Sequence, residues 1–182
     1  EYTRHVVGRH VRGINDRSPY RTKLARAFEC TDGRGAFWDS VAFYNYVQDF
    51  MTGPRENPDP QQIRAAWTPF NEVFRELNPD LTIATGKQLW TALSARLPRP
   101  EHLSLPDGGC VPYVVLSRGT GAGVVSHIKH PSTGFSYDEW CPVVAALLVA
   151  AVIVRTNDCP SYDEWCPVVA ALLDEARARV TA

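Results

Sequence analysis

The stretch Leu81-Thr82-Ile83-Ala84-Thr85-Gly86 decides the fold class. It is a short apolar run, rich in β-branched residues, that ends at a glycine, which is the pattern of a buried strand. The next segment, 87–97, places Leu89, Trp90 and Leu93 on one face of a helix. These two segments together predict a strand followed directly by a helix.

The same order of strand and helix occurs upstream. Val41-Ala42-Phe43-Tyr44-Asn45-Tyr46-Val47 is rich in aromatic and β-branched residues and is expected to form a buried strand. A loop over 53–60, rich in proline, cannot continue it. Segment 61–77 then carries apolar residues at helical spacing, and Pro79 follows as a stop.

Two further strands are expected downstream, at 113–117 and 124–128, on either side of Gly119-Thr120-Gly121-Ala122-Gly123. A strand rather than a helix follows these glycines, which favours a hairpin turn over a phosphate-binding loop. The order of elements predicts an α/β fold, a three-layer α/β/α domain with a mainly parallel central sheet of about four strands. We expect a single domain over residues 1–182.

The last third of the chain contains an internal duplication, because residues 136–148 recur without change at 161–173. Each copy has a serine, then acidic residues, then an apolar run, which is typical of a capped helix. The segment between the copies has two interpretations. Residues 149–154 form either a short strand that ends in polar residues or a continuation of the first helix.

Composition favours a globular protein without a strong overall charge. Of 182 residues, 45% are hydrophobic and 21% are charged, and the formal net charge is -1. No overall positive field is present, so any contact with a polyanion is expected to be local. The balance is uneven, at +4 over residues 1–29 and -3 from residue 157 onward. Such asymmetry marks either a phosphate-facing end or solvated helix faces.

The cysteines and the apolar runs indicate in which cellular compartment the protein is expected. Five cysteines without a C-x-x-C pair argue against a disulfide framework or a zinc knuckle. The longest apolar run, 141–154, is short of the ~18 residues that cross a bilayer. The chain begins without Met or the apolar core of a signal peptide, as a mature, trimmed or truncated chain would. We expect a soluble, cytoplasmic protein with no membrane contact.

In doubly wound α/β folds, ligands collect beyond the carboxyl ends of strands, which directs attention to 45–55, Gly86 and 130–137. Motifs in and before these regions resemble, in their order, the uracil-DNA glycosylase superfamily. They are 41–47 followed by Gly53-Pro54-Arg55, the helix 67–77, the stretch 79–86, and His130-Pro131-Ser132 followed by an aromatic residue and a helix. The similarity covers residues 36–148, about three fifths of the chain.

The resemblance implies roles in binding an extruded base. Asn45 would read the Watson–Crick edge of uracil, and Phe37 would stack on the base. His130 would lie beside the base O2 and stabilise negative charge on the departing base. Ser132 would hold a phosphate. No metal or cofactor is implied, since the five cysteines do not align with the four-cysteine arrangement of the iron–sulfur branch.

The resemblance also implies contacts with DNA. Phe135 would be the apolar wedge that fills the space left by the flipped nucleotide. Pro54 and Arg55 would belong to a loop that presses on the DNA backbone, with Arg55 meeting a phosphate.

The superfamily's first motif, a strand ending in an acid or amide that orients the attacking water, has no counterpart in residues 1–35. If 149–154 is a strand, it could replace the missing one and bring Asp158 or Asn157 to the water position. Two functions therefore stay open. The chain is either a DNA N-glycosylase, a hydrolase of base-excision DNA repair, or an inactive glycosylase-like scaffold that binds nucleic acid or protein, including a truncated or rearranged gene product.

Overall fold

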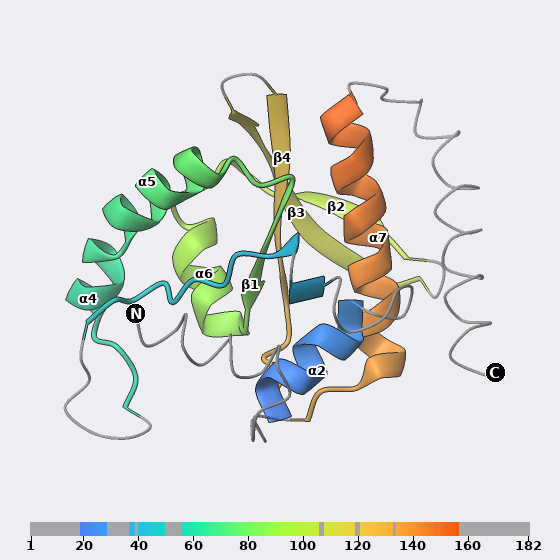
Figure 1. Ribbon diagram of the computed structural model, residues 1–182, viewed down its shortest axis with the longest axis horizontal. Coiled ribbons are helices and arrows are strands. Elements are labelled where there is room, and N and C mark those ends of the chain that lie inside the picture. The colour runs from blue at the N-terminus through green and yellow to red at the C-terminus, as the bar shows by residue number, and fades with distance from the viewer. Residues whose placement is uncertain are drawn as a thin grey trace.

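The structure, a computed structural model, describes residues 19–28, 37–38, 40–49, 56–105, 108–118, 121–132 and 134–156. This part of the chain contains both helices and strands (Figure 1). In order they are α2 (Pro19–Phe28), α4 (Pro60–Ala65), α5 (Trp67–Leu77), β1 (Leu81–Thr85), α6 (Lys87–Ser94), β2 (Glu101–Ser104), β3 (Cys110–Arg118), β4 (Gly121–Ile128) and α7 (Tyr137–Thr156). The fold is a mixed α/β fold.

The four strands form one sheet in the order β1-β4-β3-β2. Only β1 and β4 pair parallel, whereas β4 with β3 and β3 with β2 are antiparallel. The prediction of a mainly parallel sheet is therefore wrong. The reason is the length of the connections, since short links join β2, β3 and β4 and only β1 reaches its partner through a long crossover. The predicted hairpin of β3 and β4 is confirmed.

The strand predicted at 41–47 is also wrong. The structure has no strand there, and of its seven side chains only that of Tyr46 is buried. Figure 1 shows this segment crossing β1 rather than running beside it, so the two backbones cannot form a ladder. The two tyrosines pack instead on α5, with the Tyr46 ring 5.5 Å from that of Phe70, whereas Phe43 packs on α2. High β-propensity here reflects side chains suited to a half-buried surface.

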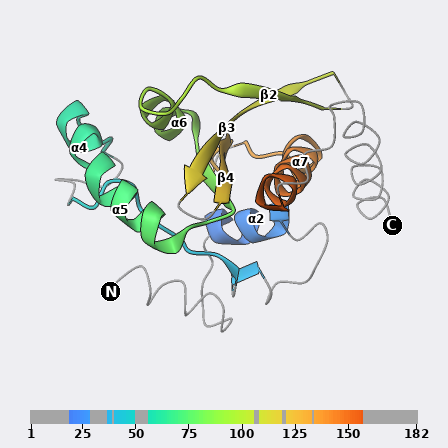
Figure 2. The same cartoon turned by 90° about the horizontal axis from the view of Figure 1, so that it is seen from above.

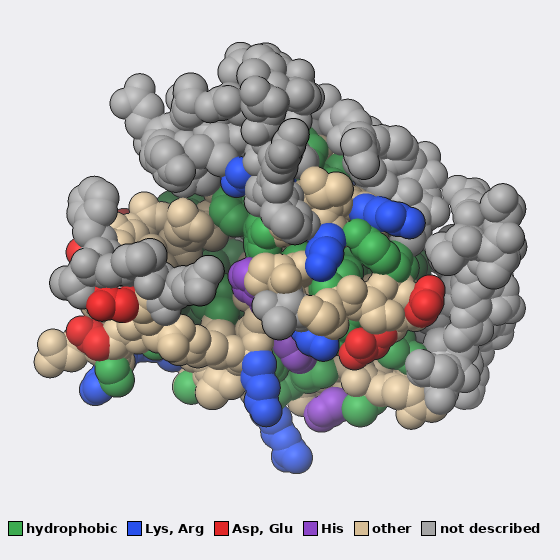
Figure 3. Space-filling view, turned by 90° about the horizontal axis from the view of Figure 1, so that it is seen from below, with side chains coloured by type: hydrophobic (Ala, Val, Ile, Leu, Met, Phe, Trp, Pro, Cys, Tyr) green, Lys and Arg blue, Asp and Glu red, His purple; other side chains and the backbone are tan. Residues whose placement is uncertain are grey.

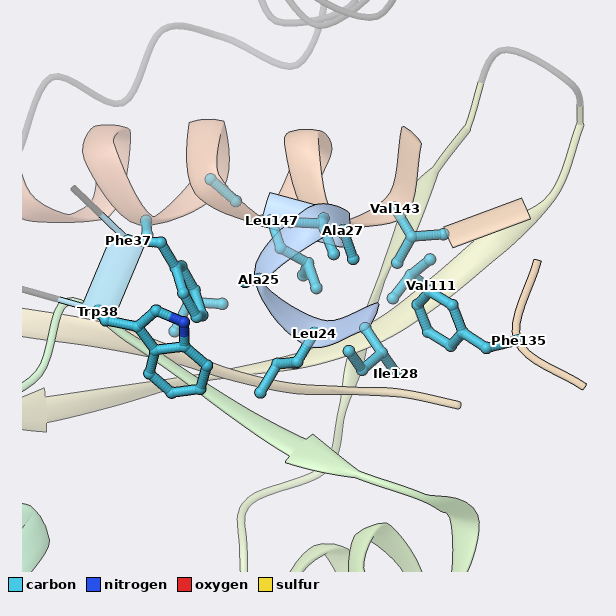
Figure 4. Packing of buried hydrophobic residues seen from close by; sticks show 14 residues of the cluster. Leu24, Ala25, Ala27, Phe37, Trp38, Val111, Ile128, Phe135, Val143 and Leu147 are labelled. Carbon is cyan, nitrogen blue, oxygen red and sulfur yellow. The ribbon is translucent and has the colours of Figure 1, made fainter. Parts of the chain in front are cut away.

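Two large hydrophobic clusters lie on the two faces of the sheet, and a small third one packs Leu103 of β2 against Ala146 of α7. Successive residues of β4 alternate between the two large clusters, with Val124 and Ile128 in one cluster and Val125 in the other. The first contains residues of α2 and α7 and is shown in Figure 4, where Leu24 and Leu147 lie close to Ile128. The second contains residues of α5 and α6, which Figure 2 shows on the other side of the sheet from α7.

The helix predicted over 61–77 forms as two helices that meet at Ala66. Asp59 caps the first of them, because its carboxylate accepts hydrogen bonds from the backbone N–H groups of Gln61 and Gln62 at 2.6 and 2.8 Å. The second ends at Asn78, which adopts the left-handed conformation with φ 46°. Strand β2 was not predicted, because its sequence Glu-His-Leu-Ser lacks an apolar alternation.

The first copy of the duplicated segment opens α7, and residues 149–154 continue that helix. The interpretation of 149–154 as a replacement strand is therefore wrong. Leu147, Ala150, Ala151 and Val154 recur at helical spacing and pack in the first cluster, so a helix buries them on one face while bonding its own backbone. The second copy, 161–173, lies outside the described residues. Among the described helices, none combines the length and apolar character that a membrane span requires.

The contact between α7 and the sheet can be tested at two adjacent leucines. Leu147 is 0% exposed, whereas Leu148 is 37% exposed. We expect Leu147→Ala to lower the free energy of unfolding by about 2–5 kcal/mol, because it leaves a cavity in the core. Leu148→Ala should cost markedly less. Urea unfolding of both variants measures the difference, and equal losses would contradict this placement of α7.

Candidate functional site

The candidate site lies where the parallel strands β1 and β4 end. The backbone N–H of Gly86 donates a hydrogen bond to the carbonyl of Ile128 at 2.8 Å, which holds the two strand ends together. Gly86 has φ 104°, a conformation that favours glycine. A Cβ built there would lie 3.4 Å from the Cβ of His130, an ordinary van der Waals contact, so the backbone conformation and not lack of space favours glycine.

Tyr20 of α2 joins the elements around His130. Its ring centroid lies 4.9 Å from that of His130, and its hydroxyl lies 3.0 Å from the Thr85 Oγ1 in a hydrogen bond. The ring of Phe43 meets Tyr20 edge-on at 5.9 Å. Burial raises the pKa of the Tyr20 hydroxyl, so this group stays a neutral hydrogen-bonding partner. Sequence reasoning missed Tyr20, because a tyrosine in a basic amphipathic segment carries no signal of a site.

The protonation of His130 follows from its neighbours. Its Nδ1 lies 2.7 Å from the Ser132 Oγ, and the backbone N–H of Ser132 donates to the same nitrogen at 3.3 Å. A backbone N–H can only donate, so Nδ1 accepts, and the neutral ring then carries its proton on Nε2. Burial lowers the pKa of His130, which favours this neutral form near pH 7. His130 is thus a neutral Nε2–H donor.

A cleft of about 980 Å³ runs along β1 to this point, and we call it the β1 cleft. Its described lining residues are Tyr20, Leu24, Phe28, Phe37, Trp38, Ser40–Tyr46, Phe70, Val73, Phe74, Leu77–Thr85, Leu89, Leu93, His130 and Leu148. Most of these side chains are apolar. A mostly apolar cleft with a few polar groups is the usual form of a binding site for a small molecule.

The structure brings three of the predicted site residues to one cleft, since Phe37, Asn45 and His130 all line it. The Asn45 side chain is exposed, and its backbone carbonyl accepts a hydrogen bond from Gln48 Nε2 at 2.8 Å. Phe37 is only 9% exposed and contacts Phe28, so it forms part of the wall. Ser132 is exposed, and it contacts His130 through both its hydroxyl and its backbone N–H.

Of the predicted DNA-contact residues, the structure describes Phe135 alone. Phe135 is buried in the first cluster, where its ring stacks on Trp140 at 6.3 Å, and it is not among the residues that line the β1 cleft. A wedge would have to leave this packing. Pro54, Arg55 and the second predicted catalytic residue, Asp158, lie outside the described residues.

Neither a patch of one charge nor a group of metal ligands marks the site among the described residues. Figure 3 views the molecule from the side on which β1 and β4 end, and the described Lys, Arg, Asp and Glu side chains there are scattered and of both signs. In the described ranges, no group of three or more His, Cys, Asp or Glu side chains is arranged to hold a metal ion.

Comparison with known proteins finds no matching family model, no matching curated protein and no matching solved structure.

The packing of Tyr20 on His130 has a measurable consequence. Tyr20→Leu removes the ring that covers the imidazole, and we expect the pKa of His130 to rise toward its ordinary value. Tyr20→Phe keeps the ring and should shift that pKa less. Histidine titration by NMR measures both. His127 is an internal control, because burial also lowers its pKa but its ring stacks on Trp90 instead. An unchanged His130 pKa in Tyr20→Leu would show that Tyr20 does not shield it.

Proposed function

We propose that this chain is a uracil-DNA glycosylase-like protein that binds an extruded base in DNA at the His130 end of the β1 cleft. The observation that supports the proposal best is that an exposed amide, two aromatic rings and a histidine donor all line one cleft. Asn45, Tyr20, Phe43 and His130 supply these groups. The order of motifs in the sequence supports the same ligand.

Recognition of the base would depend on Asn45. An amide offers one acceptor and two donors, so it can pair with the N3–H and the O4 of uracil at the same time. Cytosine presents the opposite pattern and would leave the amide badly paired, which is how a hydrogen-bonding site discriminates. The rings of Tyr20 and Phe43 offer apolar surface for the base itself.

Bond cleavage would depend on His130. Hydrolysis of an N-glycosidic bond leaves negative charge on the departing base and positive charge on the sugar. A neutral Nε2–H donor fixed beside the base can stabilise that negative charge without first giving up its own proton. The contacts of Ser132 with Nδ1 keep the proton on Nε2. The substrate we propose is uracil in DNA. The process we propose is base-excision repair, and the compartment is the cytoplasm.

A second candidate function, a scaffold that binds a base without cleaving it, is favoured by one observation. Within the described lining of the β1 cleft, the single carboxylate is Asp80, which lies at the far end of β1 and pairs with Arg155 at 3.0 Å. It cannot orient a water beside His130. Activity would therefore require an acid or an amide from outside the described lining, and Asp158 or Asn157 stays a prediction for that role.

The proposal extends to the fold and to the partners. We propose a single three-layer α/β/α domain, supported by the two clusters that the sheet divides. DNA contacts would be local, because the net charge of -1 provides no general attraction to a polyanion.

The first test is release of uracil from single-stranded and duplex oligonucleotides. If the chain is an enzyme, we expect His130→Ala to slow release by about 100-fold to 1000-fold, because it removes a donor to the departing base. His102→Ala is the matched control, since His102 lies exposed on β2. Equal rates for wild type and His130→Ala would contradict the role of His130.

Binding distinguishes the scaffold from an unrelated protein. We expect the wild type to bind uracil-containing oligonucleotides more tightly than cytosine-containing ones, and Asn45→Ala to remove most of that preference. Fluorescence anisotropy with labelled oligonucleotides measures both. A preference without base release supports the inactive scaffold. A folded wild type that shows neither preference nor release would refute both functions.

A further inference from the structure

The outer edge of β1 faces no other strand of the sheet. β1 is the last strand of the sheet and pairs with β4 alone. The carbonyl of Asp80 accepts a hydrogen bond from the N–H of Val124 at 2.9 Å, which sets the alternation along the strand. Even-numbered residues bond to β4, so the backbone N–H and C=O groups of Leu81, Ile83 and Thr85 point away from it.

These outward groups make no hydrogen bond in the structure as described. Such a row of backbone donors and acceptors is a ready template for another strand. All three residues line the β1 cleft, so the row lies along the floor of an open space rather than under a covering helix. These backbone groups could therefore pair with another segment in extended conformation, which we call the occupant.

The size of the β1 cleft fits one strand. At about 3.3 Å per residue, 4.8 Å between strands and 10 Å between packed layers, a residue in a strand occupies about 160 Å³. A cleft of about 980 Å³ holds about six such residues. Strand β1 itself has 5 residues, so an occupant of that length would pair along its whole edge.

The walls of the β1 cleft define the side chains of the occupant. Leu24 and Phe28 lie in or against the first cluster on one side of the sheet, and Phe70 and Phe74 belong to the second cluster. Successive side chains of a strand point to opposite sides. Because both sides are apolar here, the occupant must be apolar at every position, as in strands buried on both faces.

Exposed apolar side chains also line the β1 cleft. Five large hydrophobic side chains are exposed in the described part of the chain, and three of them, Val41, Leu77 and Leu148, line the β1 cleft. Clustered apolar exposure marks an interaction site, whereas scattered exposure does not.

The charge of the described lining favours an apolar occupant. The one carboxylate there, that of Asp80 at the amino end of β1, already pairs with Arg155 at 3.0 Å. This ion pair balances the charge at that end, so the β1 cleft favours an uncharged segment. A second copy of the chain fits less well, because its own β1 edge lies inside an equivalent cleft and cannot enter this one.

We propose that the β1 cleft is a peptide-binding site, which takes an extended apolar segment of another protein as an added strand on the outer edge of β1. The segment has about six apolar residues. This proposal does not rest on base binding, because its test measures the affinity for a peptide.

The decisive experiment uses three synthetic peptides of one sequence, a six-residue Val/Ile core flanked by lysines. One peptide is unmodified, and the other two carry N-methyl groups on alternate core residues, in one alternation or in the other. In an added strand, one alternation of N–H groups faces β1 and the other faces away. We expect one methylated peptide to bind at least tenfold more weakly than the other. Equal affinities of the two methylated peptides, or no binding of the unmodified one, would overturn the proposal.

Variants of the protein give an independent measurement by fluorescence anisotropy with the unmodified peptide. Leu77→Lys places a charge at the rim of the β1 cleft, at a side chain that is 53% exposed, so folding should persist. We expect it to weaken binding at least tenfold. Val152→Lys is the matched control, because Val152 is 60% exposed and is not among the lining residues. A similar loss in both variants would show that the peptide binds elsewhere.

Discussion

The parallel pairing of β1 with β4 is the constraint on which the rest of the structure depends. Five residue pairs form the ladder, from Leu81 with Val124 to Thr85 with Ile128, and the hydrogen bond from Gly86 to Ile128 closes it. Because both strands end at the same edge, the residues that follow them meet there. The site around His130 is a direct consequence of this single parallel pair in an otherwise antiparallel sheet.

Tyr20 shows how a residue outside any recognisable motif can set the chemistry of a site. It holds α2 against the end of β1 through Thr85 and covers one face of the His130 ring. Partial burial of the imidazole lowers the pKa of His130 and favours the neutral form, while the backbone N–H of Ser132 determines which nitrogen carries the proton. A neutral donor of fixed direction is the property that the proposed chemistry uses.

The β1 cleft connects the two proposals without making one depend on the other. Its polar end, at Thr85 and His130, suits a planar ligand with hydrogen-bonding edges, whereas its length along Leu81 to Thr85 suits a strand. Both features arise because β1 is an edge strand and the segment 41–47 crosses it instead of pairing with it. An occupant of the edge would end beside the residues proposed to bind the base.

The sequence by itself determined the elements whose patterns are local. The strand at 81–85, the helix that follows it and the hairpin of β3 and β4 could be predicted, because spacing, glycines and short links act within a few residues. Ordered motifs pointed to Asn45 and His130 as candidates, and both line the β1 cleft, while their roles stay predictions. Only the tertiary structure decided strand direction, the course of 41–47 and the helical state of 149–154. Each depends on which distant surface a segment can pair with or pack on, and no local pattern records that.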